Sequence, residues 1–93
     1  MRYQIDPEKI VWRNIDDEAI ILNLDSGVYY GLNKTGSLIW TLLSQKSATE
    51  NIIGELSSSY GISKKQATQD VLAMLEGLAK ESLISPQENS TPL

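Results

Sequence analysis

The feature of this sequence that most restricts its fold is a change in hydrophobic period near residue 33. In the segment AIILNL, Ile20, Leu22 and Leu24 fall on one face of an extended chain, while Ile21 and Asn23 face the other way. After residue 33, apolar residues recur every three or four positions, which is the spacing of a helix that is buried on one side. The sequence therefore predicts strands first and helices afterwards.

Three strands are expected, over residues 9–15, 19–24 and 28–32. The acidic residues 16–18 turn the chain between the first two strands. Residues 25–27, Asp-Ser-Gly, form a tight hairpin signal in which the glycine suits a positive φ. We expect these strands to form a three-stranded antiparallel sheet.

Three helical segments follow, and each is preceded by residues that can cap a helix N-terminus. The candidate caps are Asn33 or Thr35, then Ser47 or Thr49, then Ser63. Gly61 is suited to end the second helix, and the third is expected from about Lys64 to about Lys80. The expected buried stripes of the first two helices are Leu38, Ile39, Leu42 and Leu43, and Ile52, Ile53, Leu56 and Tyr60. The predicted fold class is α+β, a three-stranded sheet followed by three helices.

Length and composition indicate one folded domain. Hydrophobic residues make up 41% of the 93 residues, and the core must be aliphatic because the chain contains no Phe. Trp12 and Trp40 are expected to be half-buried anchors. The last residues carry two prolines and no apolar period, so we expect the domain over residues 1–85 and a disordered tail over residues 86–93.

The chain contains neither Cys nor His. This removes disulfides, thiolate or imidazole metal sites, cysteine nucleophiles and the commonest general base. The acidic residues are scattered, apart from Asp16-Asp17-Glu18, which fits an exposed turn better than a metal or acid–base cluster. The sequence predicts a protein that is not an enzyme and that uses no cofactor and no metal.

Net charge is −4, from eight basic and twelve acidic residues. An acidic domain repels nucleic acids and anionic membranes unless its basic residues cluster, and only Lys64-Lys65 are adjacent. The N-terminus lacks the apolar run of a signal peptide, and no segment reaches the roughly 20 apolar residues of a membrane span. We expect a cytoplasmic protein that binds neither nucleic acid nor membrane.

The third expected strand lacks the usual protection of a sheet edge. Val28, Tyr29 and Tyr30 have high strand propensity, and no Lys, Pro or inward-pointing charge interrupts them. Gly31 leaves a gap in the row of side chains, which lets another backbone approach closely. An edge that accepts a peptide strand and an ordinary hairpin arm with tyrosines packed on the core both fit these residues.

The third helix has a wider apolar arc than one core contact needs. The arc covers close to half of the helix circumference and consists of Ala67, Val71, Leu72, Met74, Leu75, Leu78 and Ala79. At its edge, Met74 lies beside Gln66, Asp70 and Gly77, so a flexible apolar side chain is bordered by polar groups. Either this edge lines a site for an apolar anchor, or the helix is simply buried on both flanks.

Residues 27–43, GVYYGLNKTGSLIWTLL, resemble the family of pyrroloquinoline-quinone synthesis protein D, PqqD. The shared pattern is an aromatic strand, then Leu-Asn, a small residue and Ile-Trp at the start of a helix. Here these are Tyr29-Tyr30, Leu32-Asn33, Gly36 and Ile39-Trp40. The resemblance continues through an aliphatic helix and an Asp-Val helix to Leu83-Ile84, and it covers residues 9–85. The segment from Leu32 to Trp40 is moderately specific, whereas the rest is generic amphipathic helix.

The resemblance implies a winged-helix-like fold and a recognition element for ribosomally synthesised, post-translationally modified peptides. In that role the leader segment of a precursor peptide adds as an antiparallel strand to the third strand and lies in a groove against the third helix. The implied peptide-binding residues are Val28, Tyr29, Tyr30, Gly31, Gln66, Asp70, Val71, Met74 and Gly77.

The implied partners are the precursor peptide and an enzyme of the same pathway that receives it. That enzyme is a radical enzyme in the quinone-cofactor setting, or a separate leader protease in the lasso-peptide setting. The hairpin over residues 25–30 is closer to the second. The alternative from another class is a winged-helix DNA-binding regulator, which the net negative charge and the strands-first order disfavour.

Overall fold

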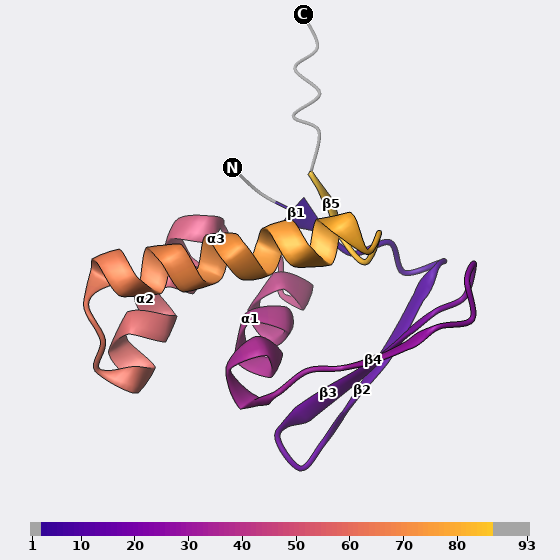
Figure 1. Cartoon of the computed structure of the whole chain (residues 1–93), viewed down its shortest axis with the longest axis horizontal. Helices are drawn as coiled ribbons and strands as arrows, with labels where there is room; N and C mark the ends of the chain where they lie inside the picture. The colour runs from indigo at the N-terminus through magenta and orange to yellow at the C-terminus, as the bar shows by residue number, and fades with distance from the viewer. Residues whose placement is uncertain (1–2, 87–93) are drawn as a thin grey trace, which may run out of the picture.

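The computed structural model describes residues 3–86, and it has the predicted α+β architecture (Figure 1). The sheet has the order β2-β3-β4, and the helices follow it in the chain. The strands of this sheet are β2 (Ile10–Ile15), β3 (Glu18–Asn23) and β4 (Tyr29–Gly31). The helices are α1 (Lys34–Ser44), α2 (Thr49–Tyr60) and α3 (Lys64–Lys80). The expected three-stranded antiparallel sheet followed by three helices is therefore confirmed.

The two turns of the sheet form where the sequence predicts them. Asp16 and Asp17 both have positive φ, 51° and 69°, at the turn between β2 and β3. Gly27 has φ 74° in the turn before β4. The buried side chain of Asn23 holds that second turn, because its Oδ1 accepts hydrogen bonds from the backbone N–H groups of Asp25 and Ser26 at 2.9 and 3.2 Å.

One of the two apolar rows of β3 is covered by the helices. Ala19 and Ile21 are fully buried, whereas Ile20 and Leu22 are only partly buried and Leu24 is 51% exposed. A buried serine fixes this arrangement: Ser37 Oγ of α1 accepts from the backbone N–H of Ala19 at 2.6 Å and donates to the carbonyl of Leu32 at 3.1 Å. The outer row therefore leaves an apolar face of the sheet open to solvent.

The helix boundaries follow the capping signals, with one exception. Asn33 Oδ1 accepts from Gly36 N at 2.8 Å and starts α1, and Ser63 Oγ accepts from Gln66 N at 3.1 Å and starts α3. Gly61 ends α2 in the left-handed conformation, with φ 62°. The expected cap of α2 was wrong: Ala48 occupies the N-cap position with no side-chain cap. Thr49 is the first residue inside that helix.

The core lies between β3 and the three helices. Trp40 is fully buried, so the expected half-buried position holds for Trp12 but is wrong for Trp40. Their ring centroids are 6.1 Å apart at an interplanar angle of 82°, an edge-to-face contact. The expected burial of Tyr60 was also wrong, because this residue is 40% exposed at the last turn of α2.

A second, two-stranded pairing joins the ends of the described chain. β1 (Tyr3–Gln4) is antiparallel to β5 (Ser85–Pro86), with Tyr3 opposite Pro86. Pro86 is the residue at which the predicted tail begins, and residues 87–93 of that tail lie outside the described residues. In the part of the chain from residue 3 to 86, no helix has the length and apolar character needed to cross a membrane.

Candidate functional site

Among residues 3–86, the edge of the sheet at β4 presents backbone groups that no neighbouring strand pairs with. In the antiparallel ladder of β3 and β4, Leu32 N donates to Ala19 O at 2.9 Å and Asn23 N donates to Val28 O at 3.0 Å. Because backbone groups alternate in direction along an antiparallel strand, Tyr29 and Gly31 direct their N–H and C=O groups away from β3. β4 therefore offers a donor and an acceptor at each of two positions to an incoming strand.

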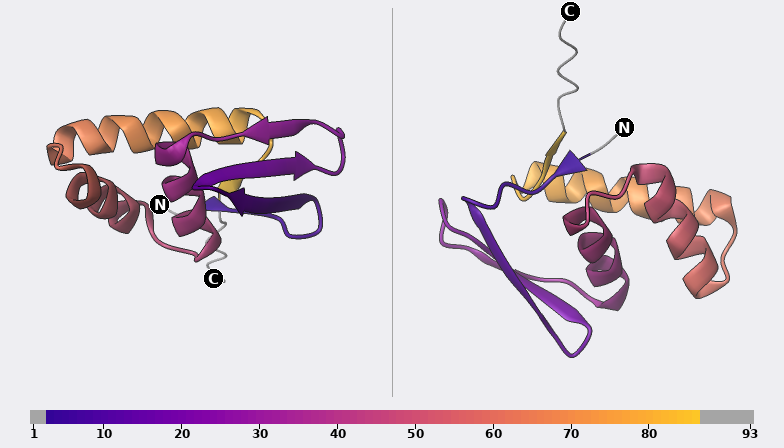
Figure 2. Two further views of the ribbon diagram at one scale, coloured as in Figure 1. Left: turned by 90° about the horizontal axis from the view of Figure 1, so that it is seen from below. Right: turned by 180° about the vertical axis from the view of Figure 1, so that it is seen from behind.

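The C-terminal half of α3 runs along this open edge (Figure 2, left). Met74, Gly77, Leu78 and Glu81 have the i, i+3, i+4, i+7 spacing of a single helix face. A groove with a volume of about 480 Å³ lies between that face and β4. Its lining is Tyr29, Tyr30, Gly31, Leu32, Ala73, Met74, Gly77, Leu78, Glu81 and Leu83. An open strand edge and an apolar helix face therefore border the same groove.

A hydrogen bond joins the two walls of the groove at its end. The hydroxyl of Tyr30 in β4 donates to Glu81 Oε1, which follows α3, at 3.1 Å. Desolvation raises the pKa of the Tyr30 hydroxyl above its ordinary value of 10.0, and the hydrogen bond and negative charge of Glu81 add to the shift. The hydroxyl therefore stays protonated near neutral pH and keeps its role as donor to the carboxylate.

The groove contains five of the nine residues that the sequence singled out. They are Tyr29, Tyr30, Gly31, Met74 and Gly77. Val28 instead lines an adjacent pocket, and Tyr30 and Glu81 line that pocket as well. Gln66 and Asp70 are exposed on the turns of α3 that precede Met74, where Gln66 Nε2 donates to Asp70 Oδ1 at 2.9 Å.

Val71 does not reach this surface. Its side chain has 0% exposure and belongs to the core, and Val71 is not among the residues that line the groove. Val71 lies at the centre of the helix's buried stripe rather than at its edge, and its expected contact with a bound peptide stays a prediction.

Several lining residues were missing from the sequence-based site. Leu78 and Glu81 continue the Met74 face by one and two helical turns, a signal that the 3.6-residue period contains. Leu32 follows the aromatic strand directly, and Leu83 comes from the segment after α3. The pairing of Tyr30 with Glu81 joins residues 51 positions apart and has no local signal.

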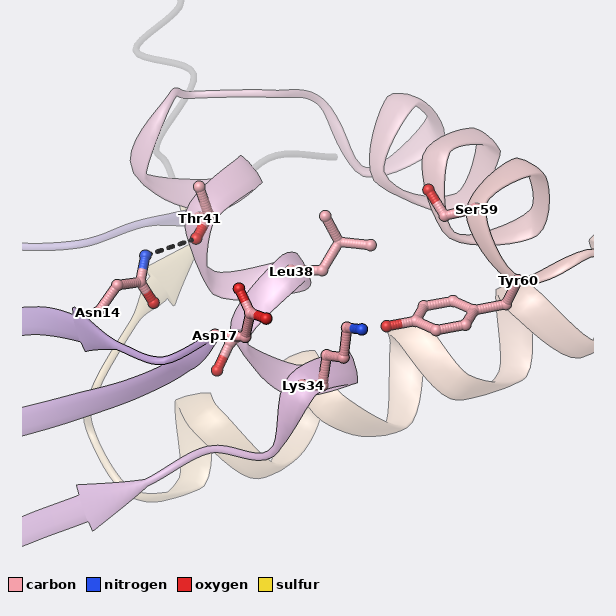
Figure 3. Close-up of a pocket in the computed structure, with 8 residues that line it drawn as sticks. Asn14, Asp17, Lys34, Leu38, Thr41, Ser59 and Tyr60 are labelled. Atoms are coloured by element: carbon pink, nitrogen blue, oxygen red, sulfur yellow. Dashed lines mark hydrogen bonds between the residues drawn. The ribbon is translucent and has the colours of Figure 1, made fainter.

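A different cavity, of about 450 Å³, lies between the β2–β3 turn, α1 and the end of α2 (Figure 3). Its side chains include one carboxylate, Asp17, and one ammonium group, Lys34, and Asn14 Nδ2 donates to Thr41 Oγ1 at 3.5 Å. A lone carboxylate gives neither an acid–base pair nor a metal cage. Within residues 3–86 there is no group of three or more potential metal-ligating side chains.

Two solved structures are similar to this domain. The structure is similar to that of TbiB1 in complex with the TbiA(beta) leader peptide, with a TM-score of 0.85 and 30% identity over 92% of this chain and 99% of that one. It also has the fold of a lasso peptide synthetase B1 complexed with the leader peptide, with a TM-score of 0.83 and 24% identity over 92% of this chain and 100% of that one. No curated protein sequence matches the chain.

The family model described as coenzyme PQQ synthesis protein D matches residues 18–84, which include β3, β4, all three helices and the whole lining of the groove. The family match spans most of the chain. This chain therefore belongs to the PqqD family.

Proposed function

We propose that this domain binds the leader segment of a ribosomally synthesised precursor peptide. The leader adds as an extended strand to the edge of β4 and places an apolar side chain in the groove against α3. The observation that carries this proposal is the juxtaposition of the outward backbone groups of Tyr29 and Gly31 with the apolar face of α3. Backbone pairing gives affinity, and the pocket beside it selects the side chain. The leader complex of TbiB1, which is 30% identical, supports the same ligand class.

The domain is a carrier and not a catalyst in this proposal. It holds the leader and presents the rest of the precursor to a separate leader protease or modifying enzyme. The similarity to TbiB1 and to a lasso peptide synthetase B1 favours a lasso-peptide pathway over the quinone-cofactor pathway.

Calorimetric titration tests this function. The ligand is a synthetic leader peptide of a candidate precursor, which a search of the neighbouring genes would identify. The control is the same peptide with its residue order scrambled. We expect a dissociation constant in the micromolar range or below for the leader and no saturable binding of the scrambled peptide. Absence of leader binding would contradict the proposal. Salt-dependent binding of random duplex DNA would favour the DNA-binding alternative.

Replacing Gly77 with Ala is expected to separate stability from binding. No heavy atom lies within 4 Å of the position that a Cβ would take, and the residue is exposed inside α3. The variant should gain about 0.5–1 kcal/mol of stability, because glycine in a helix interior costs that much relative to alanine. The new methyl group projects into the groove, so leader affinity should fall by roughly tenfold, at the lower end of the usual cost of overpacking.

Gly54→Ala is the matched control for that variant. Gly54 is also an exposed glycine inside a helix, α2, with no heavy atom within 4 Å of its Cβ position, and it does not line the groove. Its replacement should raise stability by a similar amount and leave leader affinity unchanged. Thermal melts measure the stability of both variants, and titrations measure their leader affinity. Equal leader affinities of the two variants would contradict binding of the peptide in this groove.

Asp70→Ala is expected to have a small, salt-dependent effect. Asp70 lies one turn before Met74, and its exposed carboxylate already accepts a hydrogen bond from Gln66. An exposed ion pair with a basic leader residue contributes about 0.2–1 kcal/mol, so affinity should fall at most about fivefold. The Asp70→Asn variant retains the acceptor and loses the charge. Titrations of both at low and high salt should show the loss only at low salt, and a salt-independent loss would contradict an ionic role.

A further inference from the structure

The floor of the groove depends on a residue that does not line it. Gly36 is buried in the first turn of α1, and its N–H is held by the N-cap side chain of Asn33 at 2.8 Å. A Cβ built on Gly36 would lie 2.9 Å from Met74 Cε and 3.4 Å from Leu32 Cβ. Both Met74 and Leu32 line the groove. The absent side chain of Gly36 is therefore the space into which the end of the Met74 side chain fits.

The direction in which Met74 would move follows from its surroundings. Met74 is half-buried and packed against the core, while its other side faces the groove. Protein cores have no spare volume for a displaced methyl group, whereas the groove is open. A side chain at position 36 would therefore push the flexible end of Met74 outward and make the groove shallower.

We propose that Gly36 is a specificity-determining residue, because it lets Met74 retract against α1 and so makes the groove deep enough for a large aliphatic side chain of the bound peptide. This inference rests on the proposed function, and it adds the class of anchor residue that the groove selects. Gly36 acts through Met74, so it is a positioning residue and does not contact the peptide.

The first arm of the test needs no peptide. The chain has two methionines, Met1 and Met74, so labelling the methionine methyl groups with ¹³C gives two NMR signals, one of which reports on the groove. Gly36→Ala should shift the Met74 signal and leave the Met1 signal in place. A matched Gly54→Ala variant should shift neither. An unchanged Met74 signal in Gly36→Ala would overturn the proposal.

The second arm measures selectivity. The ligand is the same synthetic leader peptide, in which each aliphatic residue is replaced in turn by Ala. The anchor is the residue whose replacement weakens binding to the wild-type domain most. Wild type should prefer the native anchor over Ala by about tenfold or more, the range for hydrophobic pockets that lose methylene groups. In Gly36→Ala that preference should shrink to within about threefold, because the shallower groove no longer accommodates the larger side chain.

The variant Gly36→Ala/Met74→Leu provides the rescue. Leucine ends one atom earlier along the side chain than methionine, so it leaves room for the new methyl group at position 36, and exchanges of these two residues are well tolerated. Preference for the native anchor should return in this double variant. If wild type binds the leader and the preference is the same in all variants, the role of Gly36 is refuted. If wild type does not bind the leader at all, the proposed function itself fails.

Discussion

Gly31→Pro is expected to weaken leader binding strongly while the domain remains folded. The N–H of Gly31 points away from β3, so proline removes no hydrogen bond from the sheet and is tolerated at such an edge position. A bound leader would lose its donor at this position, and an unpaired carbonyl in an otherwise buried ladder costs about 1–3 kcal/mol. The proline ring also fills space that the incoming backbone needs, so we expect affinity to fall roughly 100-fold, near the upper end of that range.

Gly31→Ala is the control that isolates the backbone donor. A Cβ at this position would be in ordinary contact with Ile20 Cδ1 at 3.9 Å, and the N–H is retained. Circular dichroism should show that both variants are folded, and titration should show a much larger loss for proline than for alanine. Similar losses in the two variants would mean that the side-chain gap at position 31, and not its backbone N–H, carries binding.

The Trp40→Ala variant is expected to lose about 3–5 kcal/mol of stability, which is the range for truncating a large aromatic side chain in a core. Trp40 has 0% exposure and packs edge-to-face against Trp12. A folded domain is stable by roughly 5–15 kcal/mol in total, so the variant should lose a large part of its free energy of unfolding. Urea denaturation followed by circular dichroism measures the loss directly.

The Trp40→Phe variant distinguishes the packing of the ring from its polar atom. Among residues 3–86, the buried Nε1 of Trp40 has no hydrogen-bond partner. Phenylalanine keeps much of the ring and removes this N–H, and an unpaired buried donor costs about 1–3 kcal/mol, which offsets part of the cavity cost. We expect a clearly smaller loss than for alanine. Equal losses would indicate that the indole N–H contributes to stability through a partner, such as a water molecule.

The order of the elements was predictable because each has a local signal. The change from a period of two to a period of 3.6, Gly27 and Gly61 at positive φ, and the caps Asn33 and Ser63 all depend on neighbouring residues. The buried face of β3 was not predictable, since both rows of AIILNL are apolar. The row that contains Ile21 is covered because α1 packs there, held by the hydrogen bond between Ser37 Oγ and Ala19 N. This contact forms between distant parts of the chain and has no local signal in the sequence.

The candidate site was predictable in part for the same reason. The edge of β4 and the position of Met74 follow from residue type and helical period, and both border the groove. Val71 is at the centre of the buried stripe of α3, as the helical period predicts, and its contact with the peptide stays a prediction that only the family resemblance implies. The contacts of Tyr30 with Glu81 and of Met74 with Gly36 join distant parts of the chain, so only the folded structure reveals them.

Residue-resolved amide hydrogen exchange, with and without saturating leader peptide, tests the central claim most directly. The N–H groups of Tyr29 and Gly31 face the open edge, whereas that of Leu32 is already bonded to β3. An added strand should therefore slow exchange at Tyr29 and Gly31 and change little at Leu32 or along β2, the opposite edge of the sheet. Unchanged exchange at Tyr29 and Gly31, or new protection along β2 instead, would contradict strand addition at β4.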